Sequence, residues 1–251
     1  GDVHFPLENA SVFETSKPSP RWLGFSSTEI RVGTSSGDIT GTVLLYDLVH
    51  IETDSGNIDI TVIPEPTPHE GGSSVAQLTL GASSGDIRCQ FPVWNESNIP
   101  DRDYRTSVRT HSGDISGDYV IGTEASFKVT SGEIKIIALP TTFESSSFKT
   151  ETNSGSTRVT VLEPIIRHQT QSPPPTDIID IGDDDPYLMH PHRVIPIDSD
   201  AMTTQSVTNQ QYLKHLKSFH GCSSGDMKIH YPTVWDGEIT AVTISGSIKV
   251  G

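Results

Sequence analysis

The stretch Ser36-Gly37-Asp38-Ile39 decides the fold, because its pattern of Ser-Gly, an acidic residue and an aliphatic residue returns along the chain. The pattern occurs eight times, and weaker copies replace the acid with Asn or Ser. Its glycines are Gly37, Gly56, Gly85, Gly113, Gly132, Gly155, Gly225 and Gly246. Successive glycines are 19 to 29 residues apart, except for one gap of 70. A repeat of this length, rich in Thr, Val and Ile, is typical of β-structure whose coils stack on one another.

Apolar and polar residues alternate on both sides of each glycine, which indicates β-strands. Around Gly56 the apolar positions are Val49 and Ile51 before it and Ile58 and Ile60 after it. The parity of the alternation shifts across the glycine, so Ser-Gly is predicted to be a sharp corner. The second residue after each glycine should stack in the core: Ile39, Ile58, Ile87, Ile115, Ile134, Thr157, Met227 and Ile248. We therefore predict an all-β, single-chain β-solenoid (β-helix) of about eight coils.

Prolines mark a second corner, seven to nine residues after a glycine, because proline ends strand pairing. Pro64, Pro92 and Pro164 begin the three long insertions, which reach Ser74, Asp103 and about Lys217. All three loops should therefore leave from one edge of the solenoid. The expected divisions are an N-terminal cap or extension (1–27), solenoid coils (28–161), a Pro- and Asp-rich insertion (162–217) and C-terminal coils (218–251).

One segment has a helical period. Over 206–218 and just beyond, Tyr212, Leu213, Leu216 and Phe219 would lie on one side of a helix. This pattern leaves a short helix in that segment as an undecided alternative to a strand or loop.

The repeated Thr-x-Ser-Gly-Asp-Ile pattern resembles the adhesin-type family of β-solenoid domains of unknown function, found in bacteria and fungi. The resemblance covers roughly residues 28–161 and 218–251. It implies the solenoid fold and a surface role, and it brings no catalytic residues.

Composition limits the partners. The 251 residues carry a formal net charge of −15, which argues against nucleic acid, anionic membranes and anionic polymers such as pectate. No apolar run is long enough to span a bilayer.

Sequons at Asn9 and Asn95 favour a glycosylated, extracellular or cell-surface protein. The two cysteines, Cys89 and Cys222, fall on inward positions and are predicted to be free and buried. We expect a monomer without cofactor.

The acids that follow the glycines form a row at the corner, interrupted by Asn57, Ser156 and Ser247. This row could be a structural ladder, or it could bind calcium or act in catalysis. We favour the structural ladder because calcium-binding solenoids use a different motif. Two residues further on lie the cations Arg88, Lys135, Arg158, Lys228 and Lys249. We expect them to offset the acids. The serines and threonines before the glycines are predicted to point inwards.

Binding candidates gather on the loop edge. They are Trp94, Trp235, Asp183, Asp184, Asp185, His190 and His192. Aromatic rings beside carboxylates suit sugars, although packing of the loop bases is the better explanation of the tryptophans. The three aspartates lack the spacing of a calcium loop, and His190-Pro191-His192 lacks further ligands, so we predict no metal site.

The leading hypothesis is a non-catalytic, adhesin-like cell-surface or secreted solenoid whose loop-rich edge binds glycan or protein. One alternative is a carbohydrate-active β-helix enzyme, a glycoside hydrolase or lyase, that uses loop-edge carboxylates. Another is a passive structural stalk. No serine lies in a recognisable nucleophile motif, and Gly-x-Ser-x-Gly is absent.

Overall fold

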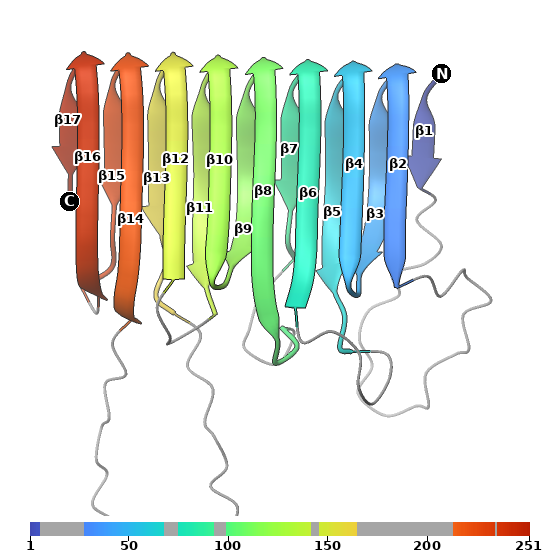
Figure 1. Ribbon diagram of the computed structural model, residues 1–251, viewed down its shortest axis with the longest axis horizontal. Helices are drawn as coiled ribbons and strands as arrows, with labels where there is room; N and C mark the ends of the chain where they lie inside the picture. The colour runs from blue at the N-terminus through green and yellow to red at the C-terminus, as the bar shows by residue number, and fades with distance from the viewer. Residues whose placement is uncertain (6–27, 68–74, 93–98, 142–145, 165–212, 234) are drawn as a thin grey trace, which may run out of the picture. The chain divides into compact units, whose positions relative to one another are not determined.

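The computed structural model describes residues 1–5, 28–67, 75–92, 99–141, 146–164, 213–233 and 235–251. This part of the chain forms two parallel sheets, sheet A with nine strands and sheet B with eight (Figure 1). The chain alternates between the sheets, so that each coil contributes one strand to each. The predicted all-β solenoid is therefore confirmed. Within these residues, no helix is long and apolar enough to cross a membrane.

The strands follow one another in each sheet in the order of the repeats. Sheet A contains β1 (Val3–Phe5), β3 (Ile39–Leu45), β5 (Ile58–Pro64), β7 (Ile87–Gln90), β9 (Ile115–Ile121), β11 (Ile134–Pro140), β13 (Thr157–Val161), β15 (Met227–His230) and β17 (Ile248–Val250). Sheet B contains β2 (Glu29–Ser36), β4 (Leu48–Ser55), β6 (Val75–Ser84), β8 (Asp103–Ser112), β10 (Glu124–Ser131), β12 (Ser146–Ser154), β14 (Leu213–Ser224) and β16 (Trp235–Ser245). Thr157 pairs directly with Met227, so the long insertion interrupts the sequence but not the stack.

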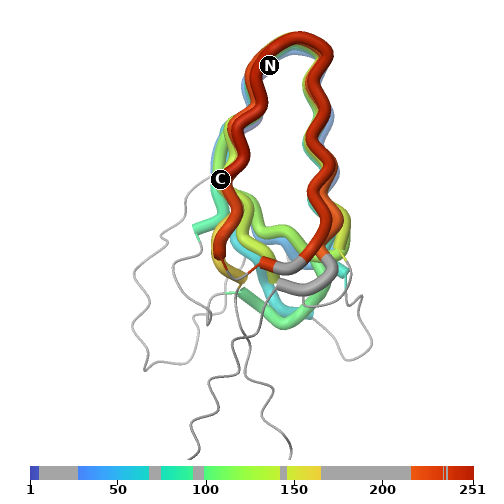
Figure 2. The backbone as a smooth tube through the Cα atoms, turned by 90° about the vertical axis from the view of Figure 1, so that its left-hand side faces the viewer, coloured from blue at the N-terminus to red at the C-terminus, as the bar shows by residue number. Residues whose placement is uncertain are grey.

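Each Ser-Gly motif is the corner where the chain passes from sheet B to sheet A. Gly85, between β6 and β7, has a φ of +144°, which other residues rarely adopt. A Cβ at Gly85 would also overlap the carbonyl oxygen of Gly56 in the preceding coil. Gly56 N donates to Ser84 O (3.1 Å), and Ile58 N donates to Asp86 O (2.9 Å). Viewed along the stack, the corners superimpose (Figure 2).

The acidic side chains at the corner extend this ladder. Asp38 Oδ1 accepts a hydrogen bond from Asn57 N (2.7 Å), and Asn57 Oδ1 accepts one from Asp86 N (2.9 Å). Asp86 Oδ1 accepts from Asp114 N in turn (2.9 Å). The same bond joins Asp114 to Glu133 and Asp226 to Ser247. These carboxylates therefore satisfy backbone amides, as the structural interpretation of the row predicts.

The prediction that the serines and threonines before the glycines point inwards is right for the threonines and wrong for the serines. The serines that precede the glycines are exposed, because the chain already turns there and the strand alternation has ended. The threonines two residues earlier do point inwards: Thr110 Oγ1 donates to Gly85 O (3.1 Å). Cys222 occupies the equivalent position in β14, with Sγ 3.3 Å from Gly155 O.

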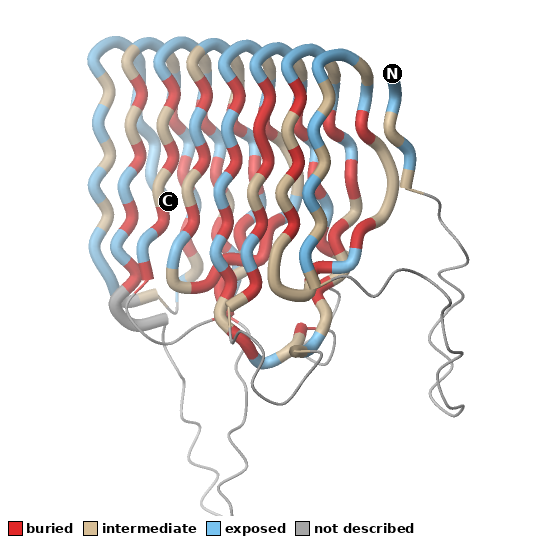
Figure 3. The backbone as a smooth tube through the Cα atoms, turned by 45° about the vertical axis from the view of Figure 1, so that its right-hand side comes forward, coloured by how far each residue is buried: buried red, intermediate tan, exposed pale blue. Residues whose placement is uncertain are grey.

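The aliphatic column lies in the core between the sheets. Ile39, Ile58, Ile87, Ile115 and Ile134 are fully buried. The alternation of buried and exposed residues follows every inner coil (Figure 3). Only Ile248 departs from the prediction, at 41% exposed, because β17 is the last strand of sheet A and no further strand among the described residues packs against it.

The N-terminal residues add a further copy of the repeat. Val3 pairs with Ile39, and Asp2 Oδ1 accepts from Asp38 N (3.2 Å), as the later acids do. Gly1-Asp2-Val3 therefore corresponds to Gly37-Asp38-Ile39. The expected cap at 1–27 thus begins with a strand of the stack, β1.

The helix left open around 206–218 is wrong from Leu213 onward, where the chain forms strand β14. Leu216 is buried, but Phe219 is exposed on the outer face of sheet B. A strand places alternate residues on opposite faces, so these two cannot share one side.

Aromatic side chains form a second column inside the solenoid. Neighbouring rings are 4.8 to 6.5 Å apart between centroids. The members, in order of contact, are Phe91, Tyr119, Phe127, Phe148, His220, Tyr231 and Trp235. Such tilted and edge-to-face contacts add to the stabilisation from burial alone.

His220 is the one titratable imidazole in this column and is fully buried. Its Nδ1 lies 2.8 Å from Thr150 Oγ1, and its Nε2 lies 3.1 Å from the Tyr231 hydroxyl. Burial lowers the pKa of His220 to about 4. The imidazole is therefore neutral at neutral pH, and both ring nitrogens have hydrogen-bond partners.

Replacing Gly85 by Ala should lower the free energy of unfolding by about 2 kcal/mol or more, because of the positive φ and the overlap with Gly56 O. Gly33→Ala is the matched control, since a Cβ at Gly33 meets nothing within 4 Å. It should change stability by no more than about 0.5 kcal/mol. Chemical denaturation measures both, and equal effects would contradict the described corner.

Stability should fall as the pH is lowered from about 6.5 to about 4, because the unfolded chain protonates His220 and the folded one does not. Above pH 6.5 the neutral His220 makes its full contribution to the free energy of unfolding. By pH 4 about 3 kcal/mol of that free energy is lost. Denaturation at several pH values measures the loss. In His220→Phe this part of the pH dependence should vanish; an unchanged profile would refute the assignment.

Candidate functional site

The long connections between strands leave from one edge, opposite the Ser-Gly corners. They follow β1, β5, β7 and β13, and the last three are those that the proline positions predict. We call this edge, where sheet A strands end and sheet B strands begin, the loop edge (Figure 1). Other coils cross it by short turns, and only Gly122 and Thr123 separate β9 from β10. The loop edge therefore accepts segments of very different length on a constant frame.

Arg102 holds the base of the loop edge together. Its side chain is buried; Nη2 donates to Asp47 Oδ1 (2.9 Å) and Val75 O (3.1 Å), and Nη1 donates to Glu65 O (3.1 Å). These partners belong to the β3–β4 turn, the segment after β5 and the start of β6. A buried guanidinium is stable only when it is paired and hydrogen-bonded, as here. Arg102 thus fixes three connections to one another, a role that the repeat pattern does not signal.

Trp235 is the one predicted binding residue that the structure describes. Its ring lies 4.8 Å from Tyr231, centroid to centroid, and packs against the core. Its Nε1 is buried without a hydrogen-bond partner among the described residues. Trp235 therefore supports the base of the loop edge and also keeps an unused donor there.

The other predicted positions lie outside the described residues. They are the candidate binding residues Trp94, Asp183, Asp184, Asp185, His190 and His192, and the sequon residues Asn9 and Asn95. That these residues form one binding site with Trp235 therefore stays a prediction.

Both cysteines are free and buried, as predicted. Burial raises the pKa of the Cys89 thiol, and Cys222 is also shifted upward for the same main reason. Thiols of this kind are weak nucleophiles, so they serve packing rather than catalysis.

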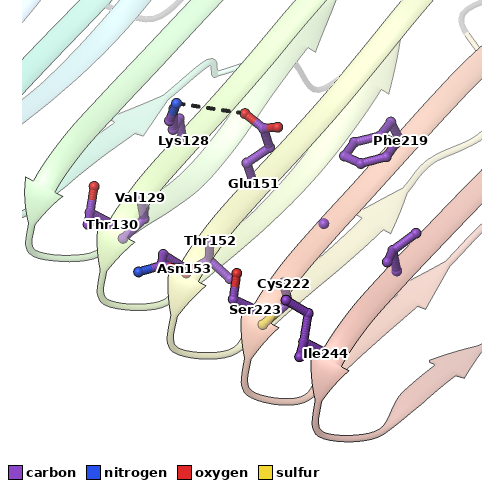
Figure 4. Close-up of a pocket in the computed structure, with 12 residues that line it drawn as sticks. Lys128, Val129, Thr130, Glu151, Thr152, Asn153, Phe219, Cys222, Ser223 and Ile244 are labelled. Carbon is purple, nitrogen blue, oxygen red and sulfur yellow. Dashed lines mark ion pairs between the residues drawn. The ribbon is translucent and has the colours of Figure 1, made fainter.

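A shallow groove of about 310 Å³ crosses the outer face of sheet B over β10, β12, β14 and β16 (Figure 4). Gly221 lines this groove and has no side chain to fill it. A Cβ at this position would lie 3.0 Å from the ring of Phe219. Phe219 and Ile244 contribute exposed apolar surface, and Glu151 forms an ion pair with Lys128 (4.0 Å). The groove can provide apolar contact and one charged pair.

Neither this groove nor a smaller hollow over β6, β8 and β10 has the groups for glycoside hydrolysis. That reaction generally uses two carboxylates that flank the bond to be cleaved. The groove contains Glu151 alone, and the hollow contains Glu124 alone. In the described part of the chain, no three His, Cys, Asp or Glu side chains gather in a way that could hold a metal ion.

Comparison with known proteins places the fold in a family. Searches of curated proteins and of solved structures returned no significant match. The family described as Toastrack DUF4097 matches residues 1–176, which span coils of both sheets and most of the repeats. Because this match covers more than half of the chain, the protein belongs to the Toastrack DUF4097 family.

Proposed function

We propose that the protein is a non-catalytic, adhesin-like binding domain, secreted or displayed at a cell surface, that recognises glycan or protein through its loop edge. The observation that carries the proposal is the confinement of the long connections to one edge. The opposite edge is a continuous ladder of backbone hydrogen bonds and admits no insertion. Repeat proteins commonly bind their partners on the decorated edge.

The loop edge is suited to recognition because its frame is rigid. Arg102 fixes the bases of the connections that lead into β4, β6 and β8, and Trp235 packs on Tyr231 at the other end of the same edge. Residues that suit sugars, Trp94 and Asp183–Asp185, belong to segments that start from this frame. A rigid base lowers the entropy lost when loops bind a partner.

The enzyme and stalk alternatives make different demands. A carbohydrate-active enzyme requires a carboxylate pair, and the two hollows described above hold one carboxylate each. A passive stalk requires no ligand at all. Binding without turnover therefore separates the proposed function from both.

Replacing residues 165–212 by Gly-Thr should abolish or weaken binding on a glycan and protein array while the solenoid stays folded. The two-residue link between β9 and β10 shows that this connection length suffices. Circular dichroism checks folding, and a polysaccharide-degradation assay on the same sample checks turnover. Unchanged binding by the shortened protein would contradict the loop edge as the recognition site. Turnover by the wild-type protein, lost on replacing one carboxylate, would establish the enzyme instead.

Trp94→Ala and Trp235→Phe test the aromatic part of this site. Trp235→Phe keeps a ring on Tyr231 but removes the indole donor, so stability should change little. We expect each variant to bind the array ligand about tenfold more weakly, equivalent to about 1.4 kcal/mol. Phe219→Ala, on the face of sheet B, is the control and should bind normally. Normal binding by both tryptophan variants would remove these residues from the site.

A further inference from the structure

Four cations form a straight row on the outer face of sheet A. Lys135 pairs in register with Arg158, Arg158 with Lys228, and Lys228 with Lys249, one residue on each of β11, β13, β15 and β17. All four are exposed. Parallel strands lie about 4.8 Å apart, so the row extends over about 14 Å along the stack. We call these four residues the cation row.

The cation row is not neutralised by neighbouring acids, contrary to the expectation from sequence. Among the described residues, none of its members forms an ion pair within 4 Å. Glu133 and Asp226 precede the row at the corner, but Asp226 accepts hydrogen bonds from the backbone and hydroxyl of Ser247 instead. Like charges directly opposite one another destabilise a sheet. A row of four is therefore a cost that folding alone does not explain.

The first half of sheet A shows that the fold does not require such a row. The same register positions there hold Thr40, Asp59, Arg88 and Ser116, two neutral residues and one charge of each sign. Along this line of register positions, an unbroken run of cations thus occurs only in the second half of sheet A, although the protein as a whole carries a charge of −15.

We propose that the cation row binds an acidic polysaccharide strand that lies along the axis of the solenoid. A line of single charges fits a linear polymer better than a compact anion, and a sugar with its linkage is of similar length to the strand spacing. Each Lys or Arg would pair with a carboxylate or sulfate of the polymer. This site lies on a sheet face and does not depend on the loop edge.

The row next to the cations supports a glycan over other polyanions. It presents Ile137, Thr160 and His230, which pair in register across β11, β13 and β15. Hydroxyl and imidazole groups can exchange hydrogen bonds with sugar hydroxyls. Single-stranded nucleic acid is usually held by several aromatic rings that stack on successive bases, and this row has no Phe, Tyr or Trp. The net charge of −15 disfavours anionic polymers for the protein as a whole, but on this part of sheet A four cations lie together without an ion pair among the described residues, so the local charge is opposite to the overall one.

The test compares two variants of the full chain with the same change of charge, from −15 to −19. In the first, Lys135, Arg158, Lys228 and Lys249 are all replaced by Gln. In the second, four cations of sheet B that form ion pairs are replaced by Gln: Arg105, Arg109, Lys128 and Lys149. The probes are labelled oligogalacturonate and a heparin-derived oligosaccharide, measured by fluorescence anisotropy at low and high salt.

Wild type and the sheet B variant should bind at least one acidic oligosaccharide, with an affinity that falls as salt increases. The cation-row variant should bind at least about tenfold more weakly, because several charge-assisted contacts are lost. It should melt no earlier than wild type, since the row is repulsive. The protein lacking residues 165–212 should still bind, which separates this site from the loop edge.

Three results would overturn the proposal. They are no binding of either oligosaccharide by wild type, equal loss of binding in both charge variants, and tighter binding of single-stranded DNA or phosphatidylserine vesicles than of the glycans. If the fourfold variant fails to fold, the pair Arg158→Gln and Lys228→Gln carries the same test at the centre of the row.

Discussion

The rest of the structure depends on the close approach of successive glycine corners. Backbone bonds such as Gly56 N to Ser84 O require the carbonyl of one glycine to occupy the place where a Cβ would stand on the next. This approach brings the corners into register, and the register stacks the aliphatic residues two positions later. The carboxylate ladder then satisfies the remaining corner amides. An exposed corner can therefore be the most constrained part of each coil.

The two edges of the solenoid consequently differ in what they can vary. At the corner, an inserted residue would break both the ladder and the side-chain bonds to the next coil. At the loop edge, the chain needs only to leave sheet A and return to sheet B, and β13 and β15 remain paired across an insertion of tens of residues. Variation, and with it recognition, is concentrated where the backbone is least constrained. The sheet faces are a third region, whose outward positions are free to carry charge patterns such as the cation row.

Much of the fold could be predicted from the repeat because one motif specifies the corner, the alternation and the register together. The copy at Gly1-Asp2-Val3 was missed because three residues alone are too short a match to the motif. The predicted orientation of the serines was wrong because the strand alternation ends where the turn begins. Arg102 could not be predicted, since its partners are set by three separate connections rather than by a period. The sequence also did not reveal that the residues of the cation row form no ion pairs within the described part of the chain. Spacing places Asp226 and Lys228 on neighbouring positions, but only the structure shows that the carboxylate bonds to Ser247 instead.

Amide hydrogen exchange tests the central claim most directly, because side-chain exposure and backbone protection disagree at the corners. The serine and acidic side chains there are exposed, yet the amides of Gly56, Gly85, Gly113 and Gly132 donate to the next coil. The account predicts that these corner amides exchange as slowly as those of the buried strands, at rates set by global unfolding. Rapid exchange at the inner corners, while the strands stay protected, would contradict it.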